Sequence, residues 1–155
     1  MKTTKSTQIV TAVGACLLAV PLVFVLSGKQ AGAHKAPHDA ETLKAFQDAF
    51  MEQVVMGDRL FHGDPDAQKQ LGVTLSQTGM ACAMCHPFSS DIHPHEFPKF
   101  QEQMSEFATL RDMVNWCIEK PNEGQKIDPN GDAMKALEAY MSWSNRGSVL
   151  DPGRH

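Results

Sequence analysis

The chain has 155 residues, of which 42% are hydrophobic and 21% charged, with 14 basic side chains, 18 acidic side chains and four cysteines. Its formal charge of −4 argues against a nucleic-acid-binding protein, which would concentrate positive charge. The length accommodates one domain of ordinary size with a modest core.

The first 33 residues have the composition of an export segment. Lys2 and Lys5 form a basic start, residues 9–26 are almost unbroken apolar sequence, and Ala-Gly-Ala at 31–33 resembles a signal-peptidase site. We predict a signal peptide over residues 1–33. A retained N-terminal membrane anchor is the alternative, because a run of 18 apolar residues is just long enough to span a bilayer.

The remaining domain, residues 34–155, keeps 11 basic and 18 acidic side chains, a formal charge of −7. This acidic surface favours a partner with a basic docking face, or serves solubility alone. Cys16 lies too near the start of the apolar run to be a lipoprotein site. We therefore place the domain in the periplasm or on the outer face of the cytoplasmic membrane.

Residues 40–61 predict an amphipathic helix with Asp39 as its N-cap. Gly57 weakens this helix by about 1 kcal/mol relative to alanine, and a close helix crossing would justify it. The following residues, 62–78, are polar and glycine-rich and predict a loop. The apolar stripe of the helix consists of Leu43, Phe46, Phe50, Val54 and Phe61.

The pentapeptide Cys-Ala-Met-Cys-His at residues 82–86 has the spacing of a c-type haem attachment site. Two thiols three residues apart, Cys82 and Cys85, can each bond one haem vinyl group, and His86 then becomes the proximal iron ligand. A thioredoxin-like redox pair is expected within a βαβ pattern, whereas the flanking sequence here predicts helix and loop. A zinc site would need a second pair of ligands at the usual spacing, and His93 and His95, two residues apart, do not match it. Haem attachment is the favoured interpretation.

Residues 87–98 are irregular and proline-rich, and they contain His93 and His95. These two histidines could bind a metal or form a docking edge, but exposed loop histidines are the simpler interpretation. They follow His86 by only seven and nine residues, which places them poorly to reach the opposite face of a haem.

Two further helices are predicted. The first runs from Thr109 as N-cap to Pro121, with Asp112 in the acidic position of a capping box. The last covers residues 133–145 and is capped by Asp132. Because no segment alternates with the period of a strand, the predicted fold class is all-α. The aromatic side chains Trp116, Tyr140 and Trp143 are expected to pack around the porphyrin.

The order of these elements resembles the class I cytochrome c fold. The resemblance lies in the first helix with Gly57 and Phe61, the haem motif, and the Leu-Glu-Ala-Tyr-Met segment at 137–141. It implies N- and C-terminal helices that cross around one covalently bound haem c. In typical members a methionine ahead of the last helix is the distal ligand, but residues 120–131 contain neither methionine nor histidine.

A narrower resemblance is to the haem domains of the A subunit of the thiosulfate-oxidising Sox complex. It rests on Phe-Pro-Lys-Phe at 97–100, on the segment 110–117 and on residues 139–147. In that group a histidine and a cysteine sulfur bind the haem iron, which the resemblance maps onto His86 and Cys117. The Sox subunit has two domains, whereas this chain has one haem motif, so catalytic function does not follow from the resemblance.

Cys117 is the cysteine that neither the haem motif nor the export segment accounts for. It follows His86 by 31 residues, enough to reach the opposite haem face, and lies on the apolar side of its helix. It is the favoured distal ligand. Met113 is the alternative ligand, and Met104 is a weaker one. If Cys117 does not bind iron, it would serve as a small buried apolar side chain, a common role for a free cysteine.

The sequence thus predicts an exported monohaem c-type cytochrome that transfers one electron at a time in a respiratory or sulfur-oxidation chain. Its expected partner is a periplasmic or membrane-bound redox protein. The alternatives are a haem subunit of an enzyme that oxidises thiosulfate or a related compound, and a haem-based sensor. Independent catalysis is disfavoured because no general base, second haem motif or basic substrate-binding cluster is recognisable, and no catalytic residue is assigned.

Overall fold

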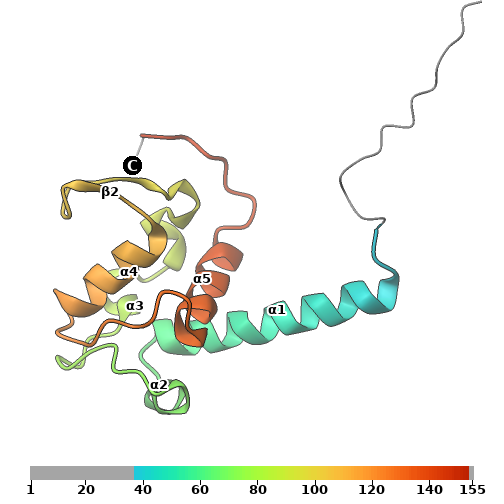
Figure 1. Ribbon diagram of the computed structural model, residues 1–155, viewed down its shortest axis with the longest axis horizontal. Coiled ribbons are helices and arrows are strands. Elements are labelled where there is room, and N and C mark those ends of the chain that lie inside the picture. The colour runs from blue at the N-terminus through green and yellow to red at the C-terminus, as the bar shows by residue number, and fades with distance from the viewer. Residues whose placement is uncertain (1–36, 154–155) are drawn as a thin grey trace, which may run out of the picture. The chain divides into compact units, whose positions relative to one another are not determined.

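Two helices cross in the computed structural model, which describes residues 37–153 (Figure 1). Helix α1 spans Ala40–Phe61 and helix α5 spans Asp132–Ser144. The carboxylate of Asp39 accepts a hydrogen bond of 2.8 Å from the backbone N–H of Thr42, as predicted for the N-cap. Asp132 is the first residue of α5 rather than its N-cap, so that prediction is displaced by one position.

The crossing of α1 and α5 is close because Gly57 has no side chain. A Cβ at Gly57 would lie 2.0 Å from the carbonyl oxygen of Ala136 and 2.7 Å from Cβ of Tyr140. The close crossing expected from the sequence is confirmed. Around it lies a cluster of buried apolar residues that includes Leu60, Phe61, Ala67, Val114, Ile118, Met134, Leu137 and Met141.

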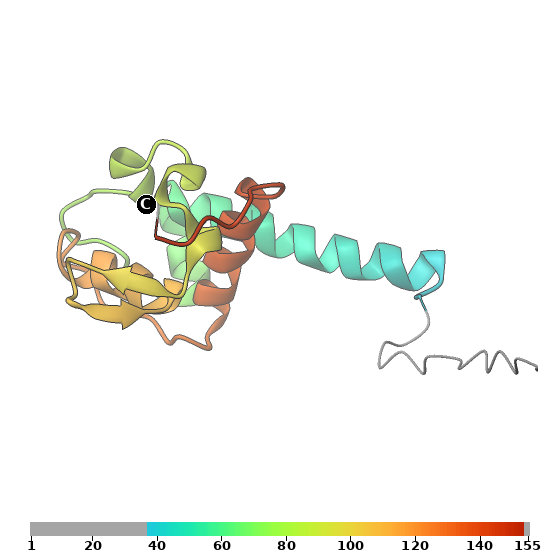
Figure 2. The ribbon, with the colours of Figure 1, turned by 90° about the horizontal axis from the view of Figure 1, so that it is seen from above.

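The N-terminal half of α1 extends beyond the other helices of the described domain (Figures 1 and 2). Its apolar side chains Leu43, Phe46 and Phe50 are 47%, 54% and 42% exposed. The predicted stripe is therefore buried only in its second half, where Val54 and Phe61 reach the core. Among residues 37–153, no helix has the length and apolar character needed to cross a membrane, and the predicted export segment lies outside this range.

A short helix, α2 (Pro65–Leu71), occupies part of the segment predicted as loop. Asp64 caps it by accepting hydrogen bonds from the backbone N–H groups of residues 66 and 67. Pro65 supplies a first helical position that needs no N–H donor, and Gly72 ends the helix at φ 63°. The Asp-Pro start and glycine stop are the signals from which this helix could have been predicted.

After the one-turn helix α3 (Cys82–Cys85), the chain forms two 3₁₀ turns, η1 (Ser89–Ile92) and η2 (Pro94–Glu96). An antiparallel hairpin follows, made of β1 (Lys99–Gln101) and β2 (Glu106–Ala108). The sequence analysis predicted no strand, and strands of three residues are too short to show a period. Outside this hairpin, the regular elements of the described domain are helices joined by loops, which confirms the all-α class.

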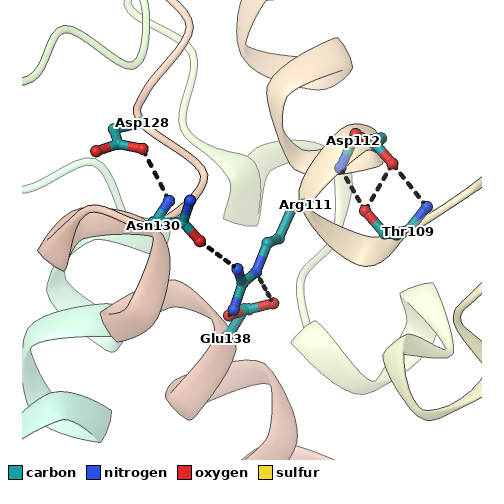
Figure 3. A network of polar contacts seen from close by, with 6 residues as sticks. All are labelled: Thr109, Arg111, Asp112, Asp128, Asn130 and Glu138. Atoms are coloured by element: carbon teal, nitrogen blue, oxygen red, sulfur yellow. Dashed lines mark hydrogen bonds and ion pairs between the residues drawn. The ribbon is translucent and has the colours of Figure 1, made fainter.

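Helix α4 (Leu110–Glu119) begins with the predicted capping box. Thr109 and Asp112 exchange the two expected hydrogen bonds, and the bond from the Thr109 hydroxyl contributes most to lowering the pKa of the Asp112 carboxyl (Figure 3). Arg111 then ties α4 to α5 through two hydrogen bonds of 2.9 Å to Glu138, and a third of 3.0 Å joins it to Asn130 in the loop before α5.

Replacing Gly57 by alanine is expected to destabilise the domain by about 3 kcal/mol, the upper end of the range for overpacking a core. The added methyl would collide with the Ala136 carbonyl, which belongs to a backbone and cannot rotate away. Thermal denaturation followed by circular dichroism measures the loss. The control is Gln53→Ala, at an exposed position of the same helix. A Gly57→Ala protein as stable as this control would contradict a close crossing.

Candidate haem site

The residues of the haem-attachment motif lie on and beside helix α3. Cys82 and Cys85 begin and end this single turn, so both thiols lie on one face of it. The backbone N–H of His86 donates a 2.9 Å hydrogen bond to the Cys82 carbonyl, which closes the turn. The thiols are thereby held three residues apart beside an imidazole, as haem attachment requires.

A cavity of about 320 Å³ opens beside this turn. Ligand-binding pockets in proteins have volumes of roughly 300–1,000 Å³, with mostly apolar walls and a few polar groups. This cavity has that character, since helices α1, α4 and α5 each contribute apolar side chains to it. The residues that bear on its chemistry are Phe61, Cys82, Cys85, His86, Asp91, His93, Leu110, Met113, Val114, Cys117 and Met141.

Burial keeps two of the thiols in this cavity protonated at neutral pH. Loss of solvation raises the pKa of Cys82 to about 11. The pKa of Cys117 is also raised to about 11, chiefly by burial and further by the neighbouring thiols of Cys82 and Cys85. The three cysteines of the described domain form no disulfide. Thiolate formation at Cys117 would therefore need a bound cation to displace the proton.

The structure separates the three predicted candidates for a distal ligand. Cys117 and Met113, one helical turn apart on α4, both line the cavity. Met104 does not line it and lies in the turn between β1 and β2. Met141 of α5 contributes a further sulfur that the sequence analysis did not name as a candidate ligand, because a methionine in a helical apolar pattern gives no sign of facing a cavity.

His86 has a carboxylate neighbour that the sequence analysis missed. Oδ1 of Asp91, in η1, lies 3.3 Å from Nδ1 of His86. A carboxylate at this ring nitrogen fixes the tautomer and the orientation of the imidazole, and leaves Nε2 for a metal. The two residues are five positions apart across a turn, a spacing that matches no regular helix or strand contact.

The aromatic residues around the cavity differ from those predicted. Trp116, Tyr140 and Trp143 do not line it, whereas Phe61 and Phe97 do. The ring of Tyr140 packs against Phe61 at 5.3 Å between centroids, beside the helix crossing. These side chains were predicted from their size alone, which does not tell which way they face on their helices.

The histidines after the motif also differ from expectation. His93 and His95 were predicted to be exposed loop residues, but both are half-buried, and His93 lines the cavity. The turn that contains them packs against α5, which withdraws their side chains from solvent.

Helix α4 is fixed beside the cavity by the buried side chain of Asn115. Its amide donates to the carbonyl of Ile127 at 3.0 Å and accepts from the N–H of Ile127 at 2.9 Å. Asn122 adds a hydrogen bond of 3.0 Å to the carbonyl of Cys117. The loop after α4 is therefore bound to the helix that carries Cys117 and Met113, and it holds both sulfurs in place.

The family model of the SoxA/TsdA cytochrome c domain matches residues 69–150, more than half of the chain. The chain belongs to this family. The match includes the haem motif, the cavity-lining face of α4 and all of α5. Membership confirms the cytochrome c fold and the predicted resemblance. It also means that this cytochrome domain carries covalently bound haem c and functions in electron transfer.

Two relatives illustrate the family. A thiosulfate dehydrogenase of Psychrobacter arcticus is 32% identical over 50 residues, which is 32% of this chain and 15% of that protein. The solved structure of thiosulfate dehydrogenase (TsdBA) from Marichromatium purpuratum, in its "as isolated" form, superposes with a TM-score of 0.49 at 21% identity. The superposition covers 77% of this chain and 28% of the chain in that structure. This cytochrome domain thus spans less than a third of either relative.

Proposed function

We propose that this protein is an exported cytochrome that transfers one electron at a time through a single haem c. Cys82 and Cys85 hold the haem covalently, His86 is the proximal iron ligand and Cys117 the distal one. The observation that carries the proposal is the cavity, which is lined both by the whole attachment motif and by Cys117.

The chain's own residues suit this group. The apolar walls of the cavity would keep water away from a bound haem, and the thiols of Cys82 and Cys85 line it. A bound haem supplies a one-electron couple at iron, and a cysteine thiolate on it would lower the reduction potential. Asn115 keeps α4 fixed, so that Cys117 remains available to the iron in both oxidation states.

The redox partner would dock where the motif meets the surface. Cys85 is exposed, and the nearby apolar side chains of Met84 and Phe88 are 68% and 72% exposed. Exposed apolar side chains around a buried haem are typical of a protein docking site. The acidic character of the chain favours a partner with a basic rim, which we place in a periplasmic respiratory or sulfur-oxidation chain.

A second candidate function is a haem subunit of an enzyme that oxidises thiosulfate. It is favoured by the Psychrobacter relative, which bears the name thiosulfate dehydrogenase and is 32% identical over its matched segment. The distinction lies in whether a sulfur compound reacts at this haem or only electrons pass through it.

The ligand assignment predicts that Cys117→Ala abolishes the thiolate charge-transfer band of the ferric protein. It should also raise the reduction potential by on the order of 100 mV or more, because a thiolate stabilises ferric iron. Met113→Leu and Met141→Leu are the matched controls, since both remove a cavity sulfur. Absorption spectra and redox titration measure the effect. If a methionine variant changed the band while Cys117→Ala did not, the distal ligand would be a thioether.

The contact between Asp91 and His86 predicts that Asp91→Asn raises the haem potential by on the order of 60 mV, which corresponds to a tenfold change in a one-electron equilibrium. The carboxylate makes the imidazole a stronger donor, and an amide does so less. Asp66→Asn removes the same charge from an exposed position of α2 and is the control. Equal shifts in the two variants would mean that Asp91 acts only as a distant charge.

The carrier function predicts that the purified haem-loaded protein does not consume thiosulfate in the presence of an electron acceptor. Its haem should nevertheless be reduced and reoxidised reversibly by small redox mediators. Thiosulfate loss is measured against a buffer control. Consumption by the wild-type protein that disappears in Cys117→Ala would establish the enzymatic alternative instead.

A further inference from the structure

A second group of ligand-type side chains lies in the turn after the haem motif. His93, His95 and Glu96 each offer one nitrogen or oxygen atom, and these three atoms all lie within 4.8 Å of one another. His93 has φ 48°, in the left-handed region, and the centroids of the two imidazole rings are 6.0 Å apart. The backbone turn thus gathers donors that are adjacent in sequence.

Glu96 is a buried acid with one oxygen left unbound. The residue is 5% exposed, and its Oε1 is buried and has no hydrogen-bond partner in the described domain. The other oxygen, Oε2, lies 3.4 Å from Nζ of Lys99. Burying a carboxylate oxygen without a partner is costly, so the free oxygen points to a bound group that is cationic or can donate a proton.

His95 repeats this pattern. Its Nδ1 is also buried and has no hydrogen-bond partner in the part of the chain that the structure describes. A buried imidazole nitrogen and a buried carboxylate oxygen on neighbouring residues, neither with a hydrogen-bond partner among the described residues, fit a metal ion better than a neutral ligand.

We propose that His93, His95 and Glu96 bind one divalent transition-metal ion of the zinc type. Two imidazoles and one carboxylate are a donor set that zinc accepts, with a fourth position left for water or another ligand. The turn is held in place by packing, since Pro94 is buried and η2 packs against α5. This site is separate from the residues proposed to hold the haem, although His93 also borders the haem cavity.

Zinc retention by the haem-loaded, full-length protein tests the site. The protein is equilibrated with Zn²⁺ at micromolar concentration and desalted, and zinc and iron are measured by mass spectrometry. We expect about one zinc per haem iron in the wild type, and at least a tenfold lower ratio in His95→Ala and Glu96→Gln. His38→Ala and His62→Ala remove histidines outside the site and should retain the wild-type ratio.

The proposal is overturned if the wild type retains no zinc, or if His95→Ala and Glu96→Gln retain as much as the two controls. It is also overturned if His93→Ala changes the haem absorption spectrum while zinc binding persists, because His93 would then serve the haem instead.

A measurement on the wild-type protein keeps the test decisive where a variant fails to fold. Zn²⁺ should protect His93 and His95, but not His62, from acylation by diethylpyrocarbonate, as mapped by peptide mass spectrometry. Equal modification of all three with and without Zn²⁺ would refute the site.

Discussion

The close backbone contact between helices α1 and α5 positions two of the helices that line the haem cavity. At Gly57 the helices approach so closely that not even a methyl group fits against Ala136. This spacing sets the rotation of α5, which presents Met141 to the cavity and turns Tyr140 towards Phe61. Arg111 and Glu138 then fix α4 against α5, so the face that carries Cys117 is placed through the same crossing.

The cavity places the thiol of Cys117 among apolar walls, and these walls affect the free thiol and the metal-bound thiolate in opposite ways. Its apolar walls make a free thiolate unfavourable, which is why the pKa of Cys117 is raised to about 11. The same walls strengthen the attraction between a thiolate and a metal cation once both are bound, because water is excluded from around them. A sulfur that is inert as a free thiol and tightly held once it binds iron would suit the ligand role that we propose for Cys117. In the proposed site, the carboxylate of Asp91 would donate electron density to the iron through His86, from the opposite side.

The sequence predicted those parts of the fold that depend on local chemistry. The bounds of α1, the Asp39 cap and the box of Thr109 and Asp112 follow from neighbouring residues, and the structure confirms them. The spacing of the Cys-x-x-Cys-His motif alone predicts haem attachment, and membership of the family supports that prediction. What could not be predicted depends on contacts between distant segments. Whether Met141 faces a cavity or the core, and that Asn115 binds Ile127, follow only from the packed helices.

Helix α1 joins two regions of very different local stability. From Val54 onward it packs against α5, so we expect those backbone hydrogen bonds to break mainly when the whole domain unfolds. Ahead of that point Leu43, Phe46 and Phe50 are largely in contact with solvent, and a helix of a few turns has little intrinsic stability in water. Amide protons in the first turns would therefore exchange with solvent by fraying of the helix end. Those of the last turns would report the global stability of the domain.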